Sequence, residues 1–300
     1  MNKLNIIVDG AVDTNEKFGK KKSQFKDVRE RFLKNKPAII CLFIILILIL
    51  CAVFAELIAP YGPDDQDLKR KLLLPGPGFP LGTDEYGRDI LSRIIYGARP
   101  SILVAAVSVT FSCLAGTMIG CIAGYYGNVI DNAFMRFIDI IQAIPSMMLA
   151  ISIAAMLGSG LSNVMIAVGI GTIPNYARLV RASIMSIKGQ EFIEAARSVG
   201  AGNIYIIFRH ILPNCLAPII VQATMSIGAA ITAAAGLSFI GLGIMPPTPE
   251  WGSMLSSGRA LIRQYWHVVT FPGLMIMITV FSFNILGDGL RDAMDPRLKK

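Results

Sequence analysis

The sequence predicts an all-α membrane protein with six transmembrane helices, and its composition and its charge-free apolar runs both support this fold class. Of its 300 residues, 54% are hydrophobic and 16% are charged, and the mean hydropathy is +0.59. Soluble domains carry about 25% charged residues, so the composition argues against a cytosolic or secreted globule. At about 20 apolar residues per crossing, six spans need roughly 120 residues. The remainder leaves no room for a large soluble catalytic domain.

The first span is expected at residues 38–55, where no charged residue occurs. This run is too long and too far from the N-terminus for a secretory signal, whose apolar region covers about 7–15 residues, so we expect the mature chain to retain it. Five further apolar segments complete the predicted set, at 101–124, 133–157, 162–179, 215–242 and 268–286.

The distribution of Lys and Arg predicts that both termini are cytoplasmic. Cytoplasmic loops of membrane proteins are enriched in these residues, and 20 of the 28 lie in the two termini and the loops on the same side as the termini. Segments 59–100 and 243–267 are then extracytoplasmic. The basic residues flank apolar runs instead of gathering on a soluble face, so we expect membrane lipids and not nucleic acid to be their partners.

The chain divides into four parts. Residues 1–36 form a cytoplasmic tail, in which Phe25, Val28 and Phe32 recur at helical spacing among basic residues. This spacing predicts a short amphipathic helix on the membrane surface; the alternative is a disordered basic tail. The other parts are 37–100 with the first span and the first extracytoplasmic loop, 101–290 with the other spans, and the cytoplasmic tail 291–300.

The second span carries Gly116, Gly120 and Gly124 at intervals of four residues. One face of this helix therefore has almost no side chains, which favours close packing with a neighbouring helix. The pattern does not say whether that neighbour belongs to the same chain.

Two polar residues in the third span, Asp139 and Gln142, are candidates for a transport pathway. Ionisable residues inside a membrane are functional candidates, although Asp139 can also pair with Arg136 along its own helix. Pro145 and Pro174 interrupt membrane helices and are either bending points or static kinks.

The cytoplasmic segment 188–213 is longer than a simple connection needs. Phe192, Ala195, Ala196 and Val199 take positions i, i+3, i+4 and i+7 of one apolar helical stripe, and Gly200 suits the residue that ends such a helix. A helix this short is marginal in water, so its apolar face must pack against something. Docking into a partner protein and packing on the chain's own membrane helices are both open.

The sequence predicts no catalytic or metal-binding residues in this chain. It contains no GxxxxGK[ST] phosphate loop, no HExxH and no GxSxG. The five cysteines form no CxxC pair, and His210 has no carboxylate at ligand spacing. We expect His210 to pack or to form a hydrogen bond near a helix break at Leu212 and Pro213.

Two motifs resemble importer permeases of the ATP-binding cassette superfamily. The first is Glu194-Ala195-Ala196 followed by Gly200 and by Leu212-Pro213, which matches the EAA loop of these permeases. The sequence His210-Ile-Leu-Pro-Asn214 is similar to that of permeases in the oligopeptide, dipeptide and nickel branch. The second motif resembles the C-type subunit of that branch and runs from 81 to 89, with Gly82, Thr83, Asp84, Gly87, Arg88 and Asp89. The resemblance covers residues 25–296.

The resemblance implies a permease core of the MetI-like type with an additional N-terminal helix and a cytoplasmic coupling helix. Its coupling positions would be Gln190, Glu191, Phe192, Glu194, Ala195, Ala196, Arg197 and Gly200, and its EAA loop would end at His210, Leu212 and Pro213. It implies a transporter subunit that is not itself an enzyme and holds no cofactor.

By the same resemblance, ATP and Mg²⁺ bind two partner ATPase subunits, beside a paralogous permease and an extracytoplasmic substrate-binding protein. The expected cargo is di- and oligopeptides carried by alternating access in the cell membrane. The alternatives are nickel import within the family and, from a different class, a secondary transporter or channel.

Overall fold

The structure is a computed structural model that describes residues 24–295. Within that range the named elements are all helices, joined by loops and two isolated bridges. The helices of eight or more residues are α1 Gln24–Phe32, α2 Lys36–Val53, α4 Ile90–Tyr126, α5 Asn128–Gln142, α6 Ser146–Leu157, α7 Leu161–Ile187, α8 Glu191–Ser198, α10 Leu212–Phe239, α11 Trp251–Gly258 and α12 His267–Met294. Shorter turns are α3 Ala55–Ile58, α9 Asn203–Tyr205, two 3₁₀ turns at Leu68–Arg70 and Arg259–Leu261, and a π-helical turn at Ile206–Ile211.

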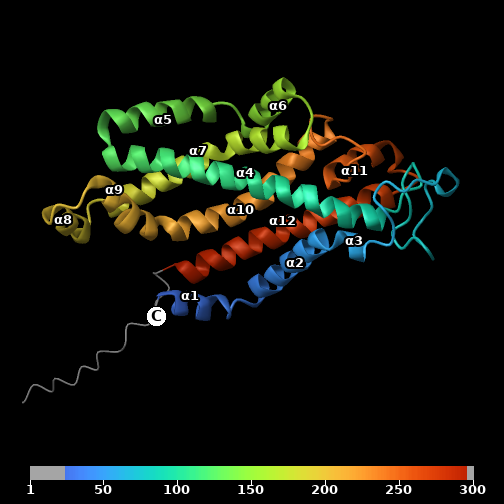
Figure 1. The fold of residues 1–300 in the computed structure, drawn as a ribbon, viewed down its shortest axis with the longest axis horizontal. Helices are drawn as coiled ribbons and strands as arrows, with labels where there is room; N and C mark the ends of the chain where they lie inside the picture. The colour runs from blue at the N-terminus through green and yellow to red at the C-terminus, as the bar shows by residue number, and fades with distance from the viewer. Residues whose placement is uncertain (1–23, 296–300) are drawn as a thin grey trace, which may run out of the picture.

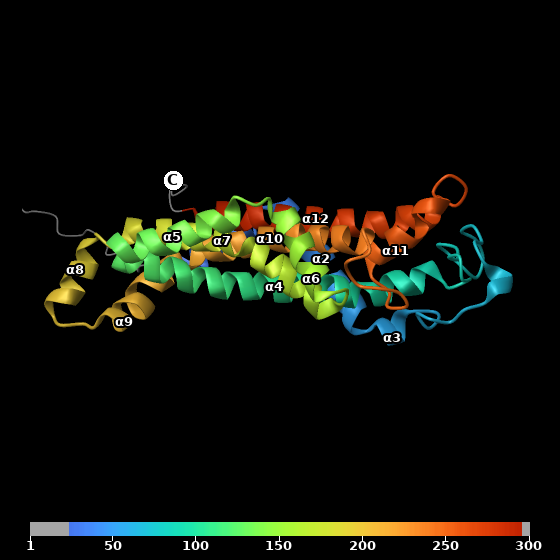
Figure 2. The same cartoon turned by 90° about the horizontal axis from the view of Figure 1, so that it is seen from above.

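The long helices lie side by side in an elongated bundle (Figure 1). Helices α8 and α9 lie at one end, which we call the α8 end. The irregular segment 59–89 and α11 lie at the opposite end, which we call the loop end. Viewed from above, α8 projects beyond the long helices (Figure 2). The two ends therefore carry different kinds of structure.

Among the described elements, helices α4 and α7 share the most extensive contact, and glycines on α4 allow a close approach. A methyl group at Gly116 would lie 2.4 Å from Cβ of Tyr176, and one at Gly120 would lie 2.5 Å from the carbonyl oxygen of Ala177. At Gly124 the nearest atom would be the carbonyl oxygen of Arg181, at 3.0 Å. The predicted glycine interface is confirmed, and its partner is a helix of the same chain.

Four helices are long and apolar enough to cross a membrane, and α5 with α6 would make a fifth if the bent pair is one span. Helix α7 has 27 residues but includes the charged residues Arg178 and Arg181, and it is not among these four helices. The predicted number of six spans is compatible with these helices, and it stays a prediction.

The span predicted at 133–157 is broken. Helices α5 and α6 meet at 82° around Ala143 to Pro145, so Pro145 marks a sharp bend. Pro174 lies within the continuous helix α7.

The helix break expected at Leu212 and Pro213 is wrong. One helical run extends over Asn203–Phe239, and Pro213 stands in the first turn of α10. The N–H of Leu212 donates to the carbonyl oxygen of Ile207, so the run is continuous here, and a local π-helical adjustment of this kind accommodates proline, which has no N–H, inside a membrane helix. The preceding π-helical turn joins α9 to α10.

The predicted N-terminal helix is present as α1, which packs along α12. Phe32 packs against the central apolar core, and Nη1 of Arg31 donates to the carbonyl oxygen of Asp295 at 3.1 Å. The disordered alternative is therefore wrong for residues 24–32. The side chain of Phe25 and the segments 1–23 and 296–300 lie outside the described residues.

Candidate functional site

Helix α8 is attached to the bundle through two side chains that point inward. Ile193 is 0% exposed and Ala196 is buried, and both belong to a core cluster with Ile184, Ile206 and Ile211. The predicted apolar stripe was partly wrong, because Ile193, which lay outside it, is the main buried residue. Ile193 and Ala196 are three residues apart, as are Phe192 and Ala195. In so short a helix, this spacing was consistent with either pair facing the bundle.

The other apolar side chains of this segment are exposed. Phe192 is 40% exposed, Val199 is 84% exposed, and Ala195 is also exposed. At positions i, i+3 and i+7 these residues share one helical face. Packing within the chain thus uses one side of α8 and leaves a second apolar side, which we call the α8 apolar face, open.

Gly200 ends α8 as the sequence predicted. Its φ is +84°, a conformation that glycine adopts without steric cost. The N–H of Gly200 donates to the carbonyl oxygen of Arg197 at 2.9 Å, and that of Ala201 donates to Ala196 at 3.0 Å, as in a Schellman ending. The predicted positions Glu191, Glu194 and Arg197 lie on α8 and are exposed. Gln190 is the N-cap residue, without a side-chain capping bond.

Tyr125 connects α8 to the membrane helices, a role that sequence reasoning missed. This buried residue near the end of α4 donates a 2.7 Å hydrogen bond from its hydroxyl to Oδ1 of Asn203. The cationic groups of Lys188 and Arg197 lie 5.7 and 5.6 Å from its ring centroid. Cations at this distance are attracted to an aromatic face, so Tyr125 joins α4, α9, the end of α7 and the end of α8.

His210 packs among aromatic rings, as predicted. Its ring centroid lies 5.6 Å from that of Tyr205 and 6.5 Å from that of Phe192. Its carbonyl oxygen accepts a 2.6 Å hydrogen bond from Asn214. Within residues 24–295, no group of three or more His, Cys, Asp or Glu side chains is placed to hold a metal ion.

Two ion pairs join α5 to α7. Asp131 accepts two hydrogen bonds from Arg181, at 2.5 and 2.6 Å. Nearer the middle of the bundle, Nη2 of Arg178 donates to Oδ1 of Asp139 at 2.6 Å. The predicted pairing of Asp139 with Arg136 is wrong, because packing of α5 on α7 brings a closer cation to Asp139.

A cavity of about 260 Å³ opens at the bend between α5 and α6. It is lined by Ile141, Gln142, Ile144, Pro145, Ser146, Leu149, Gly171, Pro174 and Asn175. The structure thus brings together Gln142 and both prolines that the sequence singled out, and it adds Asn175 from α7.

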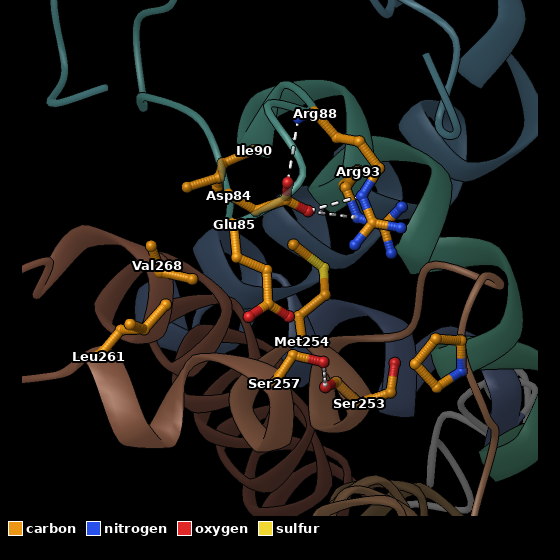
Figure 3. A pocket seen from close by; sticks show the side chains of 11 residues that line it. Asp84, Glu85, Arg88, Ile90, Arg93, Ser253, Met254, Ser257, Leu261 and Val268 are labelled. Carbon is orange, nitrogen blue, oxygen red and sulfur yellow. Dashed lines mark hydrogen bonds and ion pairs between the residues drawn. The ribbon is translucent and has the colours of Figure 1, made fainter. Parts of the chain in front are cut away.

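The loop end is held by a buried polar network built from the motif at 81–89 (Figure 3). Oδ2 of Asp84 accepts a 2.7 Å hydrogen bond from Nε of Arg88 and lies 3.7 Å from Nε of Arg93. Nη1 of Arg93 donates to the carbonyl oxygen of Pro63, and its Nη2 donates to that of Pro247. Arg93 therefore ties segment 59–89 to the loop before α11.

The rest of the motif shapes the backbone. Asp89 caps α4 by accepting from the N–H of Ser92 at 2.8 Å, and Thr83 accepts from the N–H of Leu73 at 2.9 Å. Gly87 has φ +74°, and a methyl group there would collide with the carbonyl oxygen of Asp67; Gly82 has φ +79°. These residues stabilise the loop instead of facing an open site.

Glu250 is a second buried acid at the loop end that the sequence did not reveal. Its carboxylate caps α11 by accepting from the N–H groups of Gly252 and Ser253, at 2.9 and 2.8 Å. Burial raises the pKa of Glu250 above its ordinary value, and the hydrogen bonds from Gly252 and Ser253 act in the opposite direction. The adjacent Trp251 is fully buried and donates from Nε1 to the carbonyl oxygen of Ile94 at 3.0 Å.

Comparison with known proteins decides what kind of bundle this is. The family described as "Binding-protein-dependent transport system inner membrane component" matches residues 116–300. The chain belongs to this family. A second family, "N-terminal TM domain of oligopeptide transport permease C", matches residues 23–75. The chain is therefore a multi-pass inner-membrane permease subunit of an importer, and not an enzyme, a secondary transporter or a channel.

Curated relatives match almost the whole chain. The di/tripeptide transport system permease protein DppC of Pseudomonas aeruginosa is 46% identical over 285 residues, which cover 92% of this chain and 93% of that protein. The dipeptide transport system permease protein DppC of Alkalihalophilus pseudofirmus is 48% identical, with 92% and 91% covered. The glutathione transport system permease protein GsiD of Escherichia coli is 46% identical, with 90% and 89% covered.

Solved structures share the fold of the permease core. A chain of the MetNI methionine ABC transporter, in an inward-facing conformation, has a TM-score of 0.56 and 20% identity. It covers 69% of this permease and 98% of its own length. A chain of an amino acid ABC transporter has a TM-score of 0.51, and the match covers 67% of this permease and 94% of that chain. The predicted MetI-like core is confirmed.

Proposed function

We propose that this permease forms, with a paralogous permease subunit, the translocation pathway of an ATP-driven importer for di- and tripeptides. The observation that carries the proposal is the α8 apolar face. Ile193 and Ala196 fix α8 to the bundle while Phe192, Ala195 and Val199 remain exposed, so a protein seated on α8 would move α7 and α10 with it. The names of the relatives support peptides over nickel as cargo.

The partner expected on the α8 apolar face is an ATPase subunit. An exposed apolar helix face is the kind of surface that docks in a groove of another protein. This permease contains no phosphate-binding loop, so ATP and Mg²⁺ would bind the two ATPase subunits. Closure of these subunits on ATP would pull α8 and tilt the helices attached to it.

The proposed orientation places the α8 end and both termini in the cytoplasm. The excess of Lys and Arg on that side supports it. The loop end, with segment 59–89 and α11, would then face outward, where an extracytoplasmic binding protein delivers the peptide.

The test is a charge placed on the α8 apolar face. Val199→Asp is expected to reduce co-purification of the ATPase subunits in mild detergent by at least tenfold and to abolish ATP-driven dipeptide uptake in proteoliposomes. The variant should still enter the membrane, because Val199 is 84% exposed.

The matched control is Ser198→Asp, which adds the same charge at the adjacent position, about 100° around the helix from Val199. Ser198 is also exposed, and its variant should retain the ATPase subunits. Normal uptake by Val199→Asp would contradict the proposed role of α8.

A further inference from the structure

The ion pair between Asp139 and Arg178 lies beside the cavity at the α5–α6 bend. Gln142 follows Asp139 by three residues on α5, and Asn175 precedes Arg178 by three residues on α7. Residues at this spacing are neighbours on one helix face, and both amides line the cavity. The two charges therefore stand one helical turn from the cavity, toward the α8 end.

Because both side chains are charged and exposed, we expect this pair to face water or a partner subunit and not lipid. The side chains of Arg178 and Asp139 are 47% and 52% exposed in the isolated chain. Charged side chains within membrane segments are rare and almost always face the bundle interior or a water-filled cavity, because exposure to lipid is costly. This face of α5 and α7 is thus suited to an aqueous pathway.

The pair is also built to open. It rests on one hydrogen bond between half-exposed groups, and pairs of this kind in contact with water contribute little to stability. The neighbouring Arg181 and Asp131 make two hydrogen bonds, and the side chain of Asp131 is 13% exposed. That second pair can hold α5 on α7 while Asp139 and Arg178 turn to other partners.

Resting on the proposed function, we propose that Asp139 and Arg178 bind the two charged ends of a peptide in transit. Asp139 takes the ammonium group and Arg178 takes the carboxylate, while the amides of Gln142 and Asn175 contact the peptide backbone. Two extended residues span at most about 7 Å, so a dipeptide brings both charges to neighbouring side chains. The site would favour short zwitterionic peptides.

The start of α6 adds hydrogen-bond donors to the same cavity. Its N-cap residue, Pro145, provides no side-chain hydrogen bond, and Ser146 lines the cavity. The first N–H groups of a helix lack intrahelical acceptors and favour negative charge. The cavity volume of about 260 Å³ lies just below the roughly 300–1,000 Å³ of typical small-molecule sites, as fits a small ligand.

The test measures whether dialanine protects a cysteine in the cavity. Leu149→Cys, at a cavity-lining position with no proposed contact to the peptide, is introduced after the five native cysteines are replaced. The transporter is assembled with its partner permease and ATPase subunits in nanodiscs, without the binding protein. Dialanine is expected to slow labelling of this cysteine by a small thiol reagent. N-acetyldialanine, which lacks the ammonium group, is expected not to protect.

The charge variants then separate binding from helix packing. Asp139→Asn and Arg178→Gln should each raise the half-protecting concentration of dialanine by at least tenfold. The exchange Asp131→Arg with Arg181→Asp, which keeps an ion pair between α5 and α7, should leave that concentration within about twofold of the parent's.

The parent is the single-cysteine transporter without a charge substitution. If it performs ATP-driven dialanine uptake, two results would overturn the inference while leaving the proposed function intact. One is equal protection by dialanine and N-acetyldialanine, or protection by neither. The other is an unchanged half-protecting concentration in Asp139→Asn. Absence of uptake by the parent would instead count against the proposed function.

Discussion

The hydroxyl group of Tyr125 donates a hydrogen bond of 2.7 Å to Oδ1 of Asn203. Tyr125 stands near the end of α4, the longest helix, and Asn203 begins the helical run that becomes α10. Since the guanidinium group of Arg197, at the end of α8, lies over the same ring, the side chain of Tyr125 connects both α8 and the start of α9 to α4. Tyr125 is therefore a positioning residue for α8.

Tyr125→Phe is expected to lower dipeptide transport per ATP hydrolysed by a few fold without loss of assembly. The substitution keeps the ring and its cationic neighbours and removes one hydrogen bond, which contributes about 0.5–1.5 kcal/mol. Uptake and ATP hydrolysis measured together in proteoliposomes provide the ratio. Tyr126→Phe is the control, because Tyr126 is exposed; an equal effect of both variants would contradict the positioning role.

Asp84→Asn is expected to destabilise the loop end strongly. The change leaves the buried guanidinium groups of Arg88 and Arg93 without their shared carboxylate, and breaking a buried ion pair by removing one partner costs about 3–5 kcal/mol. Limited proteolysis of segment 59–89 should become at least tenfold faster. Asp67→Asn removes a pair between half-exposed side chains, with Arg70 at 3.1 Å, and should have little effect.

Gly120→Ala is expected to lower the thermal stability of the detergent-solubilised protein. The added methyl group would lie 2.5 Å from the carbonyl oxygen of Ala177, so α4 and α7 must separate, and overpacking of this kind costs about 1–3 kcal/mol. Gly202→Ala is the matched control, since nothing lies within 4 Å of its added methyl group. Unchanged melting of the Gly120 variant would show that the helices adapt freely.

The stability contributed by Glu250 is expected to fall as the pH rises. Burial raises the pKa of Glu250 in the folded protein, so folding favours the protonated acid. Its contribution is fully present below the unfolded pKa of about 4.3 and is lost as the pH passes through the raised folded value. Between pH 4 and pH 8, the melting temperature of the parent should therefore fall relative to that of Glu250→Gln. A constant difference across this range would contradict the raised pKa.

The sequence alone determined the properties that depend on local composition and spacing. Charge-free runs predicted membrane helices because burial in lipid requires continuous apolar surface. The four-residue spacing of Gly116, Gly120 and Gly124 predicted a close helix contact, and Gly200 predicted the end of α8, because each depends on one helix face or one backbone conformation. The motifs at 81–89 and 194–213 indicated the family.

Tertiary packing alone decided which residues meet. Ile193, and not the full predicted stripe, became the buried contact of α8, because the position of the bundle selects which face of a short helix is covered. Asp139 paired with Arg178 and not with Arg136, because packing of α7 on α5 brings Arg178 within hydrogen-bond distance of Asp139. Partners distant in the chain, such as Tyr125 and Asn203, leave no spacing signal, so only the folded bundle assigns their roles.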